Sequence, residues 1–531
     1  MPLPYTIERS TLDRRSASRC GMGLAWYASE TPERPAILAP AGDRSFDQLN
    51  ARANQLVRAL RARGLQAGDA VALVCTNRPE FAEVYSAVLR CGLRLTPINW
   101  HLTGPEMAYI VNDCGARALI GDVRVAEALG AAAAEIPKTD VRIAIGGALS
   151  GFDRYDEVLE EESTADLTDP TLGATMLYTS GTTGRPKGVR RPAPARVRPG
   201  LALVAHHTDY QRERDMNLCT GPLYHAAPLA FSLAGPLAAG VGIVLMERWD
   251  SEEALRLIEQ HRITHTHMVP TMFHRLLSLT ESVRSQYDLS SMAMILHGAA
   301  PCPVAIKGAL MEWLGPIVYE YYAATEGWGS FVTPEVWLER PGTVGKPEDG
   351  QVRIAGESGD ALPPGEVGKI YLRTPTHDRF KYHGDKAKTR GAYDSSGEYF
   401  TLGDVGYLDE QGYLYLTDRS ADLIISGGVN IYPAEVDAVL LSHPAVADCA
   451  TIGIPSEDWG EEVRAVVELR AGQVGTDALS GELTAFCRER LAHYKCPRGI
   501  DFTHTLPRED SGKIFRRRVR EKYWSDRERK I

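Results

Sequence analysis

The chain has 531 residues, which is too many for one hydrophobic core and predicts at least two domains. Its 44% hydrophobic and 24% charged residues are ordinary for a globular protein, and the net charge of −10 argues against a general nucleic-acid binder. Nine scattered cysteines without a Cys-x-x-Cys pair disfavour a disulfide framework or a zinc site and favour a reducing cytoplasm. We expect a cytoplasmic protein, since the chain also shows no apolar signal core and no apolar stretch near the ~20 residues of a membrane span.

Strands and helices alternate in the first part of the chain. Residues 45–63 predict an amphipathic helix, because Leu49, Ala53, Leu56 and Leu60 recur on one helical face. The other elements predicted here are strands at 70–75, 93–98 and 118–120 and helices at 81–90 and 105–112. This alternation predicts a largely parallel sheet with helices on its faces.

A loop rich in glycine and hydroxyl residues follows an apolar run at 174–178, which predicts a short buried strand. The loop and its basic end read Thr179-Ser180-Gly181-Thr182-Thr183-Gly184-Arg185-Pro186-Lys187-Gly188. Glycines let the backbone curl around a ligand, while N–H groups, hydroxyls and the lysine favour phosphate oxygens. The spacing is not that of a Walker loop, because Gly188 rather than Ser or Thr follows Lys187. A flexible surface linker is the alternative, but the preceding strand and the terminal lysine favour a phosphate-binding loop.

The α/β alternation resumes after this loop and then gives way to shorter β-rich segments. A basic, proline-rich segment at 190–199 is predicted to be an exposed loop. Beyond it we expect strands at 216–219, 242–246, 263–269, 294–296 and 317–321, and helices at 252–261 and 271–279. From residue 342, runs at 352–354, 369–372 and 413–416 predict a small antiparallel barrel or ribbon. After a boundary near 418–422, segments at 433–441, 449–454, 463–469, 477–491 and 500–503 predict a small α+β domain.

The predicted fold class is therefore α/β in two parts. A large N-terminal domain, residues 1–419, is expected to hold two stacked α/β layers and a small β-barrel. A small α+β domain, residues 422–531, is expected to follow it.

Several segments carry residues suited to chemistry. Thr325 and Glu326 follow a predicted strand, where ligands gather in α/β sheets, although a turn with a solvated carboxylate is the alternative. Asp404 lies beside glycines, and a carboxylate there either forms a turn or accepts hydrogen bonds from a ribose diol. Lys513 lies in a basic tail, where a lysine is normally solvated. By itself, His225 is more often a structural histidine.

Taken together, these segments resemble the motifs of the adenylate-forming superfamily, which includes acyl-CoA synthetases, luciferases and peptide-synthetase adenylation domains. The matching segments lie in the family's order at 176–189, 222–229, 321–327, 401–407, 418–433 and 506–517. The chain departs from the family at Ala323, where glycine is common, and at Ala421, where the hinge residue is usually Asp or Lys. The resemblance implies that the C-terminal domain is mobile and swings about Ala421.

The resemblance also implies a complete ATP site. Tyr322 would stack on adenine, Thr325 would contact the α-phosphate region, Glu326 would hold Mg²⁺, and Asp404 would bind the ribose hydroxyls. The catalytic residues implied in this way are Lys513, Glu326, Thr325 and His225. The implied ATP- or AMP-binding residues are Thr179, Ser180, Gly181, Thr182, Thr183, Gly184, Lys187, Gly298, Ala299, Ala300, Tyr322, Ala323, Thr325, Asp404 and Arg419.

Two further subsites follow from the resemblance. The acyl pocket is implied to be small and apolar and to be formed by His225, Ala226, Ala227 and Ala323. Gly427 and Gly428 would leave a narrow passage for the pantetheine arm of CoA. No Asp occurs between His225 and Ala239, which disfavours an amino-acid substrate. The basic run 516–520 is interpreted as a solvated helix face, with contact to CoA phosphates or an anionic membrane as the alternative.

The implied function is that of an ATP-dependent acyl-CoA ligase. It would activate an apolar carboxylic acid, such as a medium- or long-chain fatty acid, as acyl-AMP and pass the acyl group to CoA, releasing AMP and pyrophosphate. Mg²⁺ is the implied cofactor, with ATP and CoA as co-substrates. The alternatives are another acceptor such as a carrier protein or oxygen, an aryl or steroid-side-chain acid, and a non-catalytic nucleotide-binding protein. The sequence implies no nucleic-acid partner and leaves open both a homodimer and peripheral contact with a membrane.

Overall fold

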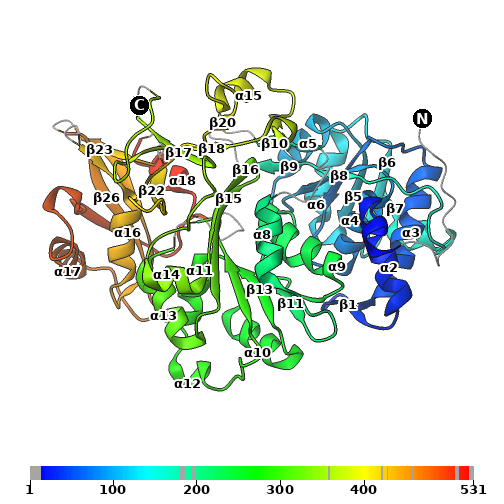
Figure 1. The fold of residues 1–531 in the computed structure, drawn as a ribbon, viewed down its shortest axis with the longest axis horizontal. Coiled ribbons are helices and arrows are strands. Elements are labelled where there is room, and N and C mark those ends of the chain that lie inside the picture. Colours follow the sequence, from blue (N-terminus) through cyan, green and yellow to red (C-terminus); the bar gives the residue numbers. More distant parts are fainter. Residues whose placement is uncertain are drawn as a thin grey trace.

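The computed structural model describes residues 13–179, 186–192, 199–300, 302–356, 359–419, 422–426, 429–456, 459–508 and 514–524. In Figure 1 the first α/β layer lies on the right, the second lies in the centre, and the smaller C-terminal domain lies on the left. The predicted α/β class, with a large N-terminal and a smaller C-terminal domain, is confirmed.

The first layer is built on a six-stranded parallel sheet with the order β7-β6-β5-β3-β4-β8. Its strands are β3 (Ala70–Val74), β4 (Arg94–Ile98), β5 (Ala116–Asp122), β6 (Val141–Ile145), β7 (Asp153–Arg154) and β8 (Ala174–Thr175). The accompanying helices are α3 (Phe46–Ala62), α4 (Pro79–Arg90), α5 (Gly104–Asp113), η1 (Val123–Val125), α6 (Ala126–Ala134) and α7 (Tyr155–Glu160). Helix α3 begins at a capping box formed by Ser45 and Gln48, and it buries the apolar face that the sequence predicts.

The second layer is built on an eight-stranded sheet with the order β16-β15-β14-β13-β11-β12-β1-β2. Its strands are β1 (Pro35–Leu38), β2 (Arg44–Ser45), β11 (Met216–Cys219), β12 (Gly242–Leu245), β13 (His265–Met268), β14 (Met294–His297), β15 (Val318–Ala324) and β16 (Gly327–Val332). Only the pairs β1–β2 and β15–β16 are antiparallel. The helices of this part are α1 (Arg14–Arg19), α2 (Gly23–Glu30), α8 (Pro199–Thr208), the π-helix η2 (Pro228–Ala234), α9 (Gly235–Ala239), α10 (Ser251–His261), α11 (Pro270–Leu277), α12 (Glu281–Arg284), α13 (Val304–Leu314) and α14 (Pro334–Glu339).

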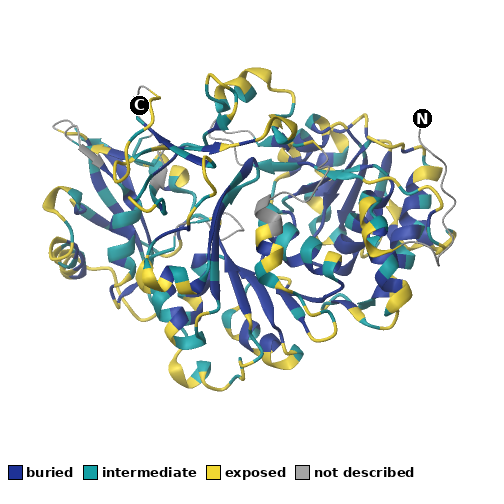
Figure 2. Ribbon diagram, in the orientation of Figure 1, coloured by how far each residue is buried: buried dark blue, intermediate teal, exposed yellow. Residues whose placement is uncertain are grey.

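One large hydrophobic core joins the two layers. It includes Leu73 of the first sheet, Ile243 of the second, and Leu56 and Val84 from helices α3 and α4. Figure 2 shows the central strands almost entirely buried, while exposed residues gather on the outer helices such as α12. The apolar sides of both sheets are therefore covered, as expected for mainly parallel sheets.

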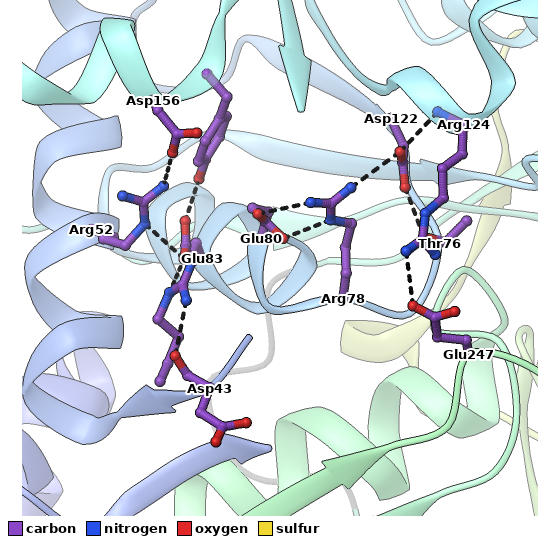
Figure 3. A network of polar contacts seen from close by, with 12 residues as sticks. Asp43, Arg52, Thr76, Arg78, Glu80, Glu83, Asp122, Arg124, Asp156 and Glu247 are labelled. Atoms are coloured by element: carbon purple, nitrogen blue, oxygen red, sulfur yellow. Dashed lines mark hydrogen bonds and ion pairs between the residues drawn. The ribbon is translucent and has the colours of Figure 1, made fainter. Parts of the chain in front are cut away.

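Charged side chains form a second link between the two layers (Figure 3). Arg78, in the turn after β3, forms ion pairs with Glu80 and Asp122. Arg124 lies next in this network and pairs with Glu247, which follows β12 of the second sheet, at 2.9 Å. Of these contacts, the partly exposed Arg124–Glu247 ion pair is the one that crosses from the first layer to the second.

Two small antiparallel sheets complete the N-terminal domain. One has the order β19-β10-β9 and consists of β9 (Leu177–Thr179), β10 (Lys187–Arg190) and β19 (Lys381–Tyr382). The other holds β17 (Val352–Ala355), β18 (Gly368–Arg373), β20 (Tyr399–Phe400), β21 (Asp404–Leu408) and β22 (Leu414–Arg419), where a barrel or ribbon is predicted. Two short helices, η3 (Thr376–Asp378) and α15 (Lys386–Ala392), lie between their strands.

The prediction of a single strand at 174–178 was wrong in one respect. This run divides at the buried Met176: β8 joins β4 in the first sheet, whereas β9 pairs with β10 in a separate sheet. Hydrogen-bonding partners that lie far away in sequence decide this division, and hydrophobicity along the chain does not reveal it.

The C-terminal domain has its own five-stranded sheet. Its strands are β23 (Ile424–Ser426), β24 (Val429–Ile431), β25 (Val446–Ser456), β26 (Gly460–Leu469) and β27 (Gly499–Thr503). The helices are α16 (Pro433–Leu441), α17 (Asp477–Arg488), η4 (His493–Lys495) and α18 (Arg516–Glu521). Val436, Ala465 and Leu483 belong to a core formed within this domain. In the part of the chain that the structure describes, no helix is long and apolar enough to cross a membrane.

Candidate active site

Strands β9 and β10 flank the predicted phosphate loop in sequence and pair with each other, so that Thr179 lies opposite Lys187. Gly188 approaches Tyr178 and the Cβ atom of His383 closely, and a side chain at this position would meet them at 3.0–3.2 Å. Residues Ser180, Gly181, Thr182, Thr183 and Gly184 lie outside the described residues, so their predicted contacts with phosphate stay predictions.

Lys187 is connected to the predicted metal-binding carboxylate through one tyrosine. The Nζ atom of Lys187 lies 5.5 Å from the centre of the Tyr382 ring. The hydroxyl of Tyr382 donates a hydrogen bond to Oε1 of Glu326 at 3.0 Å. Glu326 is buried and lies with Thr325 in the tight turn between β15 and β16. The fold therefore brings together two motifs that lie more than a hundred residues apart.

Tyr322 and Asp404, the predicted adenine and ribose residues, are in direct contact. The Tyr322 hydroxyl donates a hydrogen bond to Oδ2 of Asp404 at 2.7 Å, and both residues are buried. Asp404 begins β21 and lies opposite Arg419 of β22 in the sheet. The structure thus groups all three predicted residues, although only the backbone of Arg419 is described.

The segments that carry these site residues pack on one common hydrophobic core. It includes Val189 of β10, Tyr322 of β15 and Phe400 of β20, with Tyr382 packed against it. Gly327 allows this approach, because a Cβ atom there would lie 2.5 Å from the Phe400 ring. The β9–β10 strand pair, the β15–β16 turn and the small antiparallel sheet are therefore held in one arrangement.

The segment Gly298–Ala300 passes close to β15. A Cβ atom at Gly298 would lie 2.7 Å from both the ring and the carbonyl oxygen of Tyr321. Ala299 has a φ of 69°, which a residue other than glycine rarely adopts and which is often found at functional sites. This placement beside β15 agrees with the predicted nucleotide-binding role of the segment.

The predicted acyl-pocket residues lie near aromatic side chains. Ala227 and Ala323 both pack against a cluster that contains Tyr321 and Phe331, together with Phe231 of the π-helix. Ala323 lies at a bulge in the β15–β16 pair. His225 and Ala226 precede this helix, with the His225 and Tyr224 rings 4.6 Å apart.

The structure also shows functional candidates that the sequence analysis missed. His267 lies on β13 and shares a 3.0 Å hydrogen bond with the Tyr321 hydroxyl. Burial, and then the neighbouring His297, lower the pKa of His267 to about 3, so it is neutral. Neither His267 nor Tyr382 lies in a segment that was matched to the family from the sequence.

Three other predicted residues have no described geometry. Lys513, Gly427 and Gly428 lie outside the described residues, as does the predicted hinge, Ala421. Their roles in catalysis, CoA binding and domain movement therefore stay predictions.

Two expectations about basic residues need correction. Arg191, in the segment predicted to be an exposed loop, is largely buried and forms an ion pair with Asp378. Arg516, interpreted as part of a solvated helix face, pairs with the buried carboxylate of Asp437. A buried carboxylate needs a charged or hydrogen-bonding partner, and tertiary contacts supply it here.

The side chains of the site suit a Mg²⁺ ion that is bound partly by the protein and partly by a nucleotide substrate. Within the described ranges, no group of three or more His, Cys, Asp or Glu side chains could hold a metal ion. Glu326 offers a buried carboxylate that accepts a hydrogen bond from Tyr382, and Mg²⁺ commonly combines one or two carboxylates with phosphate oxygens. The protein would thus supply Glu326, and a bound nucleotide would supply the other oxygens.

This fold, with its paired strands β9 and β10, Glu326 turn and buried Tyr322–Asp404 pair, defines an enzyme of the adenylate-forming type. The family model described as "AMP-binding enzyme" matches residues 24–377, and that described as "AMP-binding enzyme C-terminal domain" matches residues 435–513. The chain therefore belongs to the AMP-binding enzyme family, and the predicted superfamily is confirmed.

Named relatives match over nearly the whole chain. A 2-succinylbenzoate–CoA ligase of Geobacillus kaustophilus is 35% identical over 92% of this chain and 95% of its own length. The fatty acid–[acyl-carrier-protein] ligase ScoC of Streptomyces coeruleorubidus is 31% identical over 96% of this chain and 97% of its own. The crystal structure of the anthranilate CoA ligase AuaEII with anthranoyl-AMP superimposes with a TM-score of 0.84 and 26% identity, covering 97% of this chain and 99% of that one.

Proposed function

We propose that this protein is an ATP-dependent ligase that joins an apolar carboxylic acid to CoA through an acyl-adenylate. One observation carries the proposal. Lys187, Tyr382 and Glu326 form a connected group that joins the β9–β10 strand pair to the β15–β16 turn. A cation and a carboxylate in this arrangement suit a metal-bound triphosphate, and the family membership supports the same chemistry.

The first step is adenylation. A carboxylate oxygen of the acid attacks the α-phosphorus of ATP, the bond to the bridging oxygen breaks, and pyrophosphate leaves. Lys187 and the loop N–H groups would stabilise the negative charge that builds on the phosphate oxygens. A Mg²⁺ ion bound at Glu326 would neutralise part of the same charge. The protein needs positioning and electrostatics here, and no covalent nucleophile.

The second step is thioester formation. The CoA sulfur attacks the acyl carbonyl, and AMP leaves as its phosphate takes back the electrons of the broken C–O bond. Pyrophosphate has already left, so Lys513 is no longer needed beside the α-phosphate. We propose that the C-terminal domain turns about Ala421, withdraws Lys513 and brings Gly427 and Gly428 beside the thiol.

The proposed acid is an apolar monocarboxylate with a chain or a ring. Small Ala227 and Ala323 lie beside Phe231 and Tyr321, which suits an apolar group. His267 is neutral and so offers no positive charge to a second carboxylate. Aromatic side chains favour an aryl acid as well as a fatty acid, and the similar proteins include ligases named for anthranilate and for fatty acid.

A carrier protein is the alternative acceptor. The similarity to ScoC, which is named as a ligase for acyl-carrier protein, favours this second candidate. Adenylation would be identical, and only the molecule that supplies the phosphopantetheine thiol would differ.

The test measures ATP–pyrophosphate exchange with octanoate, palmitate, benzoate and cinnamate, followed by thioester formation with CoA or a pantetheinylated carrier protein. We expect exchange with at least one apolar acid and thioester formation with CoA. Absence of exchange with every acid would reject adenylation, whereas transfer to the carrier alone would replace CoA as the acceptor.

A second experiment tests Lys513. Lys513→Ala should lower exchange about a hundredfold or more, because one charged group would no longer stabilise the α-phosphate transition state. Thioester formation from supplied acyl-AMP should remain near the wild-type rate. Lys522→Ala is the control, since Lys522 is an exposed lysine of the same C-terminal region. Equal losses in both half-reactions would reject the assignment of Lys513.

A further inference from the structure

Tyr382 lies outside every segment that the sequence analysis linked to chemistry, yet it contacts two of them. It ends β19, where its backbone lies opposite Val189 of β10. Its hydroxyl donates to Glu326 at 3.0 Å, and its ring lies 5.5 Å from the ammonium nitrogen of Lys187. One side chain therefore touches both an anion and a cation of the proposed site.

The surroundings of Tyr382 hold it in place. Its backbone N–H donates to the Thr389 hydroxyl at 3.0 Å, and the next N–H, of His383, donates to the Gly188 carbonyl at 2.8 Å. The Phe380 ring packs edge-on against the Tyr382 ring with centres 5.2 Å apart. A side chain fixed by backbone pairing and by ring packing can position its neighbours with little loss of conformational entropy on ligand binding.

We propose that Tyr382 is a positioning residue of the adenylation site. Its hydroxyl holds one oxygen of Glu326 so that the carboxylate faces a Mg·ATP ligand, and its ring guides Lys187 toward the same phosphates. This inference depends on the proposed function, because it assigns Tyr382 a role at that site.

The hydrogen bond from the phenol to Glu326 suits this role. The Tyr382 hydroxyl donates to the carboxylate at 3.0 Å, and a hydrogen bond to an ionised partner is among the stronger ones in proteins.

The test is Tyr382→Phe, which removes the hydroxyl and keeps the ring near Lys187. Calorimetric titration with the α,β-methylene analogue of ATP should show about tenfold weaker binding in the presence of Mg²⁺. Without Mg²⁺ the difference should fall to about twofold or less, because the hydroxyl acts through the metal-binding carboxylate. The melting temperature should change little, so a folding defect can be told apart from a loss of positioning.

Tyr393→Phe is the matched control. Tyr393 belongs to the same aromatic group, with its ring stacked 5.1 Å from Phe380, but its hydroxyl donates to the Phe380 carbonyl at 3.0 Å. Removal of the Tyr393 hydroxyl should leave the affinity for the ATP analogue unchanged. Equal weakening by both substitutions would overturn the inference.

A double-mutant cycle with Glu326→Gln separates positioning through Glu326 from a direct contact with ATP. In the Glu326→Gln background, Tyr382→Phe should add less than about a twofold effect, since coupled residues are not additive. Fully additive effects would overturn the inference. If the wild-type protein binds and exchanges normally while Tyr382→Phe does the same, only the inference fails. If the wild-type protein does not bind the analogue, the proposed function fails and the inference fails with it.

Discussion

The buried His267 connects the candidate site to the pH dependence of the protein's unfolding free energy. His267 lies on a central strand, hydrogen-bonded to Tyr321 and stacked against Phe231 with ring centres 5.7 Å apart. An unfolded histidine takes up a proton near pH 6.5, but in the fold the pKa of His267 is lowered to about 3 by burial and then by His297. Between these pH values the unfolded chain binds the extra proton, so acid favours unfolding.

We therefore predict that His267→Gln reduces the acid sensitivity of the protein. Between pH 7 and pH 5 the variant should lose about 2 kcal/mol less unfolding free energy than the wild type, since a full pKa unit corresponds to about 1.4 kcal/mol. Urea unfolding monitored by tryptophan fluorescence at the two pH values measures this difference. His504→Gln, at an exposed position, is the control and should leave the pH dependence unchanged. An equal loss for wild type and His267→Gln would contradict the prediction.

Short connecting segments hold the helices and strands around the site in position. The turn after β3 shows this clearly, because Asn77 is buried between the two layers. Its Nδ2 donates to the carbonyls of Gly221 at 2.9 Å and Met246 at 3.0 Å, and its Oδ1 accepts from the Leu223 N–H at 2.9 Å. All three partners belong to the second layer, which also carries the segment leading to His225.

Replacing Asn77 with alanine should weaken this junction. The Met246 carbonyl and the Leu223 N–H would lose the Asn77 amide as a partner, and the Gly221 carbonyl would keep the Cys219 thiol, so we expect a loss on the order of 3 kcal/mol of unfolding free energy. Chemical denaturation measures the loss. Asn112→Ala is the comparison, because Asn112 is exposed and makes one bond to the Glu135 carbonyl at 2.9 Å. That variant should lose less than about 1 kcal/mol, and similar losses in both would argue against a special role for Asn77.

At the scale of the whole molecule, the two domains have separate hydrophobic cores. The clusters around Val436, Ile452 and Ile431 contain only residues of the C-terminal domain, as far as the structure describes the chain. Between the domains, Arg470 donates to the Ser278 hydroxyl at 3.3 Å. An exposed polar contact of this kind contributes little stability, which is compatible with the proposed movement of the C-terminal domain.

We accordingly predict that residues 422–531 fold alone. The fragment should show a cooperative thermal transition by circular dichroism, because its cores are formed internally. It should show no ATP–pyrophosphate exchange, since Lys187 and Glu326 lie outside it. The Leu483→Asp variant of the fragment is the control: it buries a charge in the core and should abolish the transition. A non-cooperative melt of the wild-type fragment would refute separate folding.

The sequence by itself determined the central strands of both layers, several of their helices and the change of texture after residue 342, whereas strands such as β1, β6 and β16 were not predicted. Helix α3 and strand β11 lie where they were predicted, because apolar periodicity and end-capping residues act over short distances. The resemblance supplied roles for Tyr322, Glu326 and Asp404, which no local pattern establishes. It also assigned roles to Lys513 and to the hinge residue Ala421, which lie outside the described residues.

Only the tertiary structure decided which distant segments meet. It divided the apolar run at 174–178 between two sheets, placed Arg191 and Arg516 in ion pairs, and brought Tyr382 into contact with both Lys187 and Glu326. The physical reason is that strand pairing and burial of charge depend on partners far away in sequence, and a lone tyrosine carries no local sign of them.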